Sequence, residues 1–104
     1  MVMAKAKDLR TMRKHAGSAA AMLAALSNEA RLGVLCDLVE GERLAGELVE
    51  RSGLSQSALS QHLGKLRESG LVATRREGVS VFYRIANPDA ARILDVLHEI
   101  YCKR

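Results

Sequence analysis

The stretch from residue 55 to residue 67 places the strongest constraint on the fold of this chain. Leu59, Leu63 and Leu66 repeat there at the i, i+4, i+7 spacing of one buried helical face. The opposite face carries short hydrogen-bonding groups and one cation, with no large apolar side chain. Such a surface fits the major groove of DNA, where amides and hydroxyls reach base edges and phosphates. The stretch predicts a DNA-recognition helix; the alternative is a generic helical hairpin with a solvated polar face.

The residues just before this stretch favour the same interpretation. A short helix is expected over residues 45–52, and Gly53 stands where a left-handed residue would end it. Ser55 then offers its hydroxyl as the N-cap of the next helix, which Gly70 is expected to end. A helix, a tight glycine turn and a capped helix follow one another in a helix-turn-helix motif, which we place at about residues 44–69.

The segment that follows is rich in β-forming residues. Residues 71–76 and 79–85 flank Glu77-Gly78, which predicts a short hairpin, or wing, within about residues 71–86. The predicted fold class is therefore mainly α with a small β-hairpin. We expect a single winged helix-turn-helix domain over residues 1–104.

The two ends of the chain are expected to form long helices, over about residues 8–26 and 88–102. Asn28 is expected to cap the helix that follows the first, and Asn87 to cap the last helix, with Pro88 at its first position. The last helix carries more apolar residues than a terminal appendage can hide. Because a chain of 104 residues buries only a modest core, dimerisation is a natural way to bury more. We therefore predict that the two end helices form the surface of a homodimer.

The charge of the chain indicates a polyanionic partner. The net charge is +4 and the sequence pI is about 9.4, with the basic excess over residues 58–84, where the recognition helix and wing would meet DNA. The predicted partner is double-stranded operator DNA. The residues expected in the groove are Gln56, Ser57, Ser60, Gln61 and His62. The candidates for phosphate contact are Lys65, Arg75 and Arg76. For His62 helix packing is the alternative, and for the arginines ordinary strand solubility.

Other classes of protein find little support in the sequence. No apolar run approaches the roughly 20 residues that span a bilayer, and the N-terminus has no signal-peptide core. We therefore expect a cytoplasmic protein with no membrane partner, whose thiols are reduced by default. There is no catalytic-triad spacing, no phosphate-binding glycine loop and no recognisable acid pair. We expect no enzymatic activity and no cofactor.

The two cysteines, Cys36 and Cys102, are 66 positions apart and form no CxxC motif. Cys36 falls on the stripe of Leu32, Leu35 and Val39, whose spacing is that of a core-facing helix side. One interpretation is a small buried hydrophobe at Cys36 and a bystander at Cys102. Metal binding is a weaker alternative, because few potential ligands accompany the thiols, and we expect no metal site.

Four motifs lie along the chain from about residue 16 onward. They are residues 27–32, 54–63, 66–72 and Phe82-Tyr83. Together they strongly resemble the ArsR family of bacterial repressors. The metal-sensing branches of that family are less similar, because residues 45–52 lack a cysteine pair and Asp89 is followed by Ala91 where those branches have a histidine.

The cysteines narrow the resemblance. Residues 35–42 and 97–102 are similar to the persulfide-sensing branch, the group of BigR, SqrR and HlyU. That branch implies a homodimer that binds operator DNA while both thiols are reduced. Reactive sulfur species then link the two cysteines within a subunit, as a disulfide or through inserted sulfur atoms, and DNA affinity falls.

By this resemblance Cys36 and Cys102 are the redox-sensing candidates. Two alternatives stay open. One is a regulator of the same fold that senses peroxide, nitrosative stress or a metal ion. The other is a winged-helix module that binds a protein.

Overall fold

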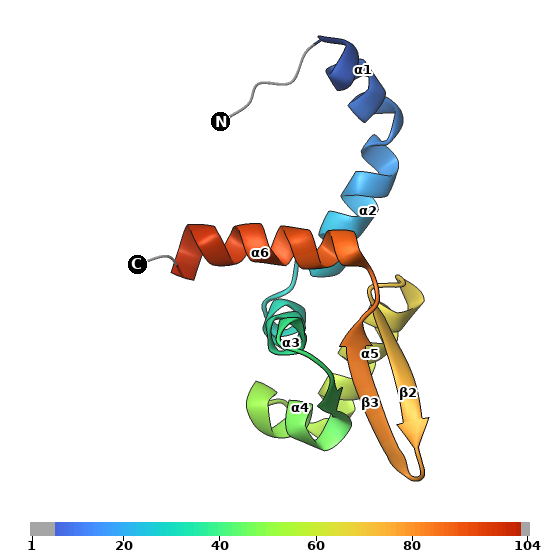
Figure 1. Ribbon diagram of the computed structural model, residues 1–104, viewed down its shortest axis with the longest axis vertical. Helices are drawn as coiled ribbons and strands as arrows, with labels where there is room; N and C mark the ends of the chain where they lie inside the picture. Colours follow the sequence, from blue (N-terminus) through green and yellow to red (C-terminus); the bar gives the residue numbers. More distant parts are fainter. Residues whose placement is uncertain (1–5, 103–104) are drawn as a thin grey trace.

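The computed structural model describes residues 6–102, so residues 1–5 and 103–104 of the predicted domain lie outside the described part. The elements in chain order are α1 (Ala6–Lys14), α2 (Ala16–Leu26), α3 (Glu29–Val39), β1 (Arg43–Leu44), α4 (Ala45–Ser52), α5 (Gln56–Glu68), β2 (Val72–Glu77), β3 (Ser80–Ile85) and α6 (Pro88–Cys102). Figure 1 shows their arrangement. The predicted winged helix-turn-helix, mainly α with a small hairpin, is confirmed.

Short-range signals begin and end most of these helices as predicted. The side chains of Asn28 and Ser55 each accept the backbone N–H of the residue three positions on, at 3.0 and 3.1 Å, at the start of α3 and α5. Asn87 accepts backbone N–H groups at the start of α6. Gly53 and Gly70, at φ +70° and +74°, follow the ends of α4 and α5 in the left-handed conformation that glycine adopts without strain.

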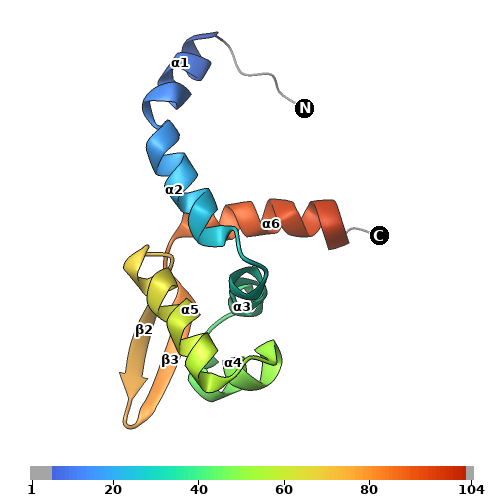
Figure 2. The ribbon, with the colours of Figure 1, turned by 180° about the vertical axis from the view of Figure 1, so that it is seen from behind.

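The core lies between the helices and one face of the sheet. Its buried side chains are Leu26, Val34, Leu35, Leu38, Leu48, Leu59, Leu63, Leu66, Leu71, Val72, Ala90 and Leu94. The three leucines predicted for the recognition helix are among them. Figure 2 shows α5 beside the β2–β3 hairpin, in the position expected of a recognition helix next to its wing.

The sheet has three antiparallel strands in the order β1-β3-β2. Strand β1 is not predicted by the sequence pattern: Leu44, expected in the helix-turn-helix, pairs instead with Phe82 of β3. The wing turn is Gly78-Val79, one residue later than predicted. Glu77 pairs with Ser80, so the positive φ of +62° falls on Gly78 at the first turn position, as in a type II′ hairpin.

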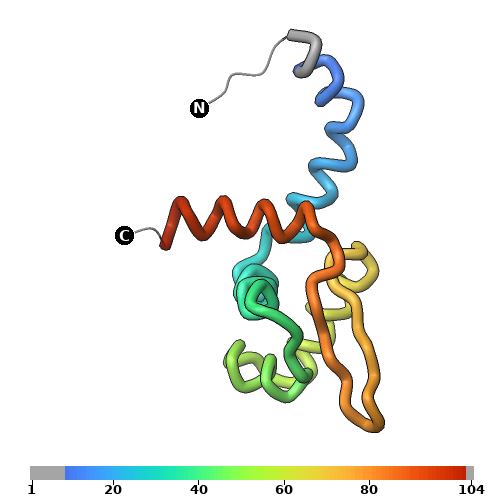
Figure 3. Tube along the Cα trace, in the orientation of Figure 1, coloured from blue at the N-terminus to red at the C-terminus, as the bar shows by residue number. Residues whose placement is uncertain are grey.

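The single long helix predicted over residues 8–26 is wrong. The chain breaks at His15 into α1 and α2, and the N–H of His15 bonds to the carbonyl of Met12 at 3.0 Å, a three-residue turn. His15 and Gly17 are weak helix formers within an otherwise alanine-rich run. Figure 3 shows the arm formed by α1 and α2 extending away from the rest of the chain, where little packing supports a continuous helix.

Among residues 6–102, no single helix is long and apolar enough to cross a membrane. Helices α2 and α3 reach the necessary length and apolarity only as a pair, and a 90° bend separates them.

Candidate functional site

Helix α5 has one buried and one exposed face. The leucine face packs into the core, and the other side is open to solvent. The predicted groove residues on the open side are Gln56, Ser57, Ser60 and Gln61, and Lys65 follows them in the last turn. The fold therefore brings these five residues together on one exposed surface. Arg67, also exposed in the last turn, adds a cation that was not predicted from the sequence as part of this surface.

His62 lies at the edge between these two faces. Its side chain is half-buried, and within the described residues its buried Nδ1 atom has no hydrogen-bond partner. A buried ring nitrogen without a hydrogen-bond partner lowers stability, because it has lost its contact with water and gained none in return. The structure thus separates His62 from its exposed neighbours on α5.

The two wing arginines differ in their surroundings. Arg76 is exposed, whereas the guanidinium of Arg75 donates to the carboxylates of Glu42 and Glu77. These hydrogen bonds lower the pKa of Glu42 and raise the pKa of Arg75. Glu42 was not singled out from the sequence, because it is 33 positions from Arg75 and no local pattern links them.

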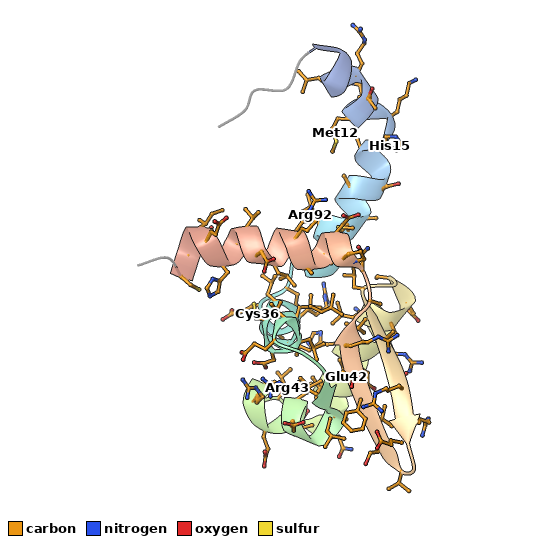
Figure 4. All side chains as sticks on the ribbon, viewed as in Figure 1. Met12, His15, Cys36, Glu42, Arg43 and Arg92 are labelled. Atoms are coloured by element: carbon orange, nitrogen blue, oxygen red, sulfur yellow. The ribbon has the colours of Figure 1, made fainter. Side chains whose placement is uncertain are left out.

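Both cysteines are free thiols and exposed to solvent. The expectation that Cys36 faces the core is wrong: α3 buries Val34, Leu35 and Leu38 instead. Two apolar stripes overlap on this helix, and α4, α5 and the sheet pack against the one that excludes Cys36. Figure 4 shows Cys36 on α3, below α6 in that view.

A pocket of about 350 Å³ lies beside Cys36, between α3 and α6. Its lining residues are Cys36, Val39 and Glu40 from α3, and Leu94, Asp95 and His98 from α6. Cys102 stands one helical turn beyond His98 on α6. Asp95 was not predicted as part of this site, although its position three residues before His98 places both on one side of a helix.

The surroundings of Cys36 favour its neutral form. Partial burial, the carboxylate of Asp37 and the charge of Cys102, in that order, raise the pKa of the Cys36 thiol. Solvent can reach the sulfur, but less thiolate is present at neutral pH than in an ordinary cysteine.

The arm and α6 carry most of the exposed large apolar side chains. On these elements they are Leu9, Met12, Leu23, Val96, Ile100 and Tyr101. A groove of about 930 Å³, lined by Met12 and by α6 residues from Asp89 to Leu97, lies between the arm and α6. The two elements diverge in Figures 1 and 2, which leaves this apolar surface open.

Among residues 9–102, whose side chains the structure describes, no three His, Cys, Asp or Glu side chains come close enough together to hold a metal ion.

An exposed polar helix in a helix-turn-helix, followed by a basic hairpin, defines a winged helix-turn-helix DNA-binding protein. Comparison with known proteins agrees. Residues 28–74 match the model of the family described as bacterial regulatory protein, arsR family. The transcriptional activator HlyU of Vibrio cholerae is 45% identical over 92% of this chain and 89% of HlyU. The biofilm growth-associated repressor of Xylella fastidiosa is 46% identical over 88% of this chain and 80% of its own.

Solved structures give the same result. The structure of reduced HlyU from Vibrio cholerae has a TM-score of 0.84 at 45% identity, over 89% of this chain and 98% of that one. The repressor BigR from Xylella fastidiosa has a TM-score of 0.86 at 44% identity, over 91% of this chain and 97% of that one. This chain belongs to the ArsR family and is a DNA-binding transcriptional regulator similar to HlyU and BigR, which confirms the resemblance found in its sequence.

Proposed function

We propose that this protein is a dithiol-based repressor that acts in the cytoplasm. The reduced homodimer binds operator DNA, and it releases the DNA when a persulfide or polysulfide links Cys36 and Cys102 within one subunit. The observation that carries the proposal is the position of Cys36, an exposed free thiol on α3 beside a pocket whose other wall is α6, the helix that ends at Cys102.

The chemistry needs only two thiols and a sulfur donor. The Cys36 thiolate attacks the outer sulfur of a persulfide, the rest of the donor leaves as a thiol, and Cys36 becomes a persulfide. A second transfer lengthens the chain by one sulfur. The Cys102 thiolate then attacks a sulfur of this chain and expels hydrosulfide, which closes a disulfide or a bridge with inserted sulfur. A direct disulfide needs Cα atoms about 4.4–6.8 Å apart, and each inserted sulfur relaxes that requirement.

The raised pKa of Cys36 leaves less thiolate, which slows its reaction with peroxide and with persulfide alike, so the pKa does not separate the two inducers. The pocket of about 350 Å³ beside Cys36 leaves room for a small donor and for added sulfur atoms. The pocket therefore favours reactive sulfur over a general oxidant, which stays the second candidate. Metal sensing has no comparable support among the described residues.

The apolar surface of the arm and α6 supports the proposed dimer. Ile100 and Tyr101 are 63% and 80% exposed at the end of α6, and Leu9 and Leu23 are each 57% exposed on the arm. A second copy that covers these residues would remove them from water. It would also set the spacing of two α5 helices to match half-sites about one DNA turn apart.

The exposed residues of α5 are proposed to enter the major groove of each half-site. Gln56 and Gln61 supply amides for base edges, and Ser57 and Ser60 supply hydroxyls for bases or phosphates. We keep His62 as a candidate at the margin of this surface. Lys65 and Arg76 are the proposed phosphate contacts, since an exposed cation suits that role.

A covalent bridge between α3 and α6 would join the helix that precedes the helix-turn-helix to a helix of the proposed dimer surface. A small shift between them changes the distance between the two recognition helices. Because such a shift weakens several phosphate contacts at once, affinity then falls steeply, and the more so at higher salt.

The test is DNA release by the wild type and by Cys36→Ser and Cys102→Ser. A duplex selected by the wild-type protein from a random library serves as the probe, and fluorescence anisotropy measures binding before and after a persulfide donor. Both variants should bind as tightly as the reduced wild type, and only the wild type should release. Release by either variant would falsify the two-cysteine mechanism while leaving DNA binding intact.

A further inference from the structure

The guanidinium of Arg75 is held from three sides. Its Nε donates to both carboxylate oxygens of Glu42, at 3.0 and 2.8 Å, and its Nη1 donates to Glu77 at 2.6 Å. Its central carbon lies 4.2 Å from the ring centroid of Phe82, which adds a cation–π contact. Charge-assisted hydrogen bonds with this geometry are the stronger kind of surface ion pair, because several contacts fix one planar group.

Strand register places the neighbouring arginine on the other face of the sheet. Arg75 stands opposite Phe82 and Arg76 opposite Val81. Successive residues of a strand face opposite sides, so Arg76 shares a face with Val72, which is buried in the core against α5. Arg76 therefore lies on the recognition-helix side of the wing, and Arg75 on the outer side.

The Glu42–Arg75 pair spans the width of the sheet. Glu42 immediately precedes β1, Arg75 lies in β2, and β3 runs between these two strands. Phe82 of β3 pairs with Leu44 on one side and with Arg75 on the other, so the ion pair passes over the central strand at this ring. β1 contributes only two residues to the sheet. The ion pair is thus a second connection, besides the pairing of β1 with β3, between the loop that follows α3 and the wing.

We propose that Arg75 is a positioning residue rather than a phosphate contact: the Glu42–Arg75 brace fixes the wing against the loop that joins α3 to β1. The wing then presents Arg76 to the DNA backbone at a set angle. The brace also joins the wing to the loop that leaves α3, the helix that carries Cys36. A movement of α3 would therefore move the wing. This inference rests on the DNA binding proposed above and replaces the sequence-based expectation for Arg75.

The brace and a phosphate contact predict opposite results for Glu42→Gln. If Arg75 were a phosphate contact held back by Glu42, removing the carboxylate would free a cation and tighten DNA binding. If the pair is a brace, the variant loosens the wing, and affinity falls by about two- to fivefold, the range of a well-formed surface ion pair. Glu50→Gln, at an exposed acid on α4, controls for the general effect of removing one negative charge.

Salt dependence provides the second readout. Removing one phosphate contact reduces the steepness of log affinity against log salt by about 0.9, hence by about 1.8 in a dimer. Arg76→Gln should show that reduction. Arg75→Gln should leave the slope unchanged, weaken binding as much as Glu42→Gln, and add nothing to it in the double variant. Arg75→Lys should behave like Arg75→Gln, because lysine keeps the charge but cannot make the forked contact.

Hydrogen exchange at the backbone amides of β2 tests the brace without DNA. Glu42→Gln should speed exchange there, Glu50→Gln should not, and circular dichroism should show that both variants are folded. Tighter DNA binding by Glu42→Gln, a reduced salt slope for Arg75→Gln, or unchanged β2 exchange would each overturn the brace. If the wild type bound no selected duplex, the proposed function would fail, while the exchange result would still decide on the brace.

Discussion

Helices α5 and α6 are both amphipathic, yet the apolar side of α5 is buried and much of the apolar side of α6 is exposed. α5 buries Leu59, Leu63 and Leu66 against its own chain and leaves polar groups on its open side. α6 leaves Ile100 and Tyr101 63% and 80% exposed, and the arm has a similar apolar surface.

This difference separates two kinds of interface. A helix whose apolar side is already buried against its own chain can offer hydrogen-bonding groups to a polar, charged partner such as DNA. A helix whose apolar side is left exposed needs another apolar surface, which a second copy would supply in the proposed homodimer. The same chain thus carries one surface complete in the monomer and one that a dimer would complete.

The largest expected effect is on stability and comes from a substitution on the buried apolar side of α5. Leu66→Ala should lower the free energy of unfolding by about 2–5 kcal/mol, because Leu66 is fully buried and the cavity cannot collapse completely. Chemical denaturation measures it at fixed protein concentration. Val79→Ala, at a wing-tip residue that is 99% exposed, is the control and should change stability by less than about 0.5 kcal/mol. A decrease below about 1 kcal/mol for Leu66→Ala would contradict the described core.

The exposed apolar side of α6 is tested by placing a charge on it. Ile100→Asp should weaken the proposed dimer about a hundredfold or more, because a symmetric interface would bury the new carboxylate twice without a partner. Sedimentation velocity over a concentration series measures the dissociation constant. Val79→Asp introduces the same charge at the wing tip and should leave association unchanged. Equal dimer affinity in both variants would show that α6 is not the interface.

The polar side of α5 is tested by two variants that remove different kinds of contact. Gln61→Ala should weaken binding to the selected duplex about tenfold and leave non-specific binding unchanged, because it would remove the proposed base-edge contact. Lys65→Gln should weaken both and reduce the salt slope by about 1.8 for the proposed dimer, because it would remove the proposed phosphate contact in each subunit. Identical effects on selected and random duplexes for Gln61→Ala would exclude a base contact.

The smallest expected effect is on the pH dependence of the Cys36 thiol, which lies on α3. In the Cys102→Ser background, alkylation of Cys36 by iodoacetamide should keep accelerating beyond pH 9.0, because the folded chain raises the pKa of this thiol and only the thiolate reacts. Asp37→Asn should move the profile to lower pH by removing a nearby negative charge. A plateau below neutral pH would mean that Cys36 is an activated thiolate.

Features set by nearby residues were predictable from the sequence. The caps at Asn28, Ser55 and Asn87 and the glycines after α4 and α5 act over three or four residues, so pattern alone locates them. The leucine spacing of α5 likewise identified both its buried face and its exposed polar residues.

Features set by distant packing were not predictable. Residue spacing on α3 could not tell which of two overlapping stripes the rest of the chain would cover, and so Cys36 was assigned to the wrong one. The arm lacks the packing that would hold a helix through His15. Strand β1 and the partner of Arg75 depend on contacts between segments that are far apart in the sequence, 33 positions in the case of Arg75 and Glu42.

The most direct test of the dithiol mechanism is peptide mass spectrometry on reduced dimers reconstituted from isotope-labelled and unlabelled chains. The protein is treated with glutathione persulfide and, separately, with peroxide. We predict a Cys36–Cys102 peptide cross-linked within one chain that carries added sulfur after persulfide treatment only. An unmodified pair, a mixed-label cross-link, or the same plain disulfide with both reagents would contradict it.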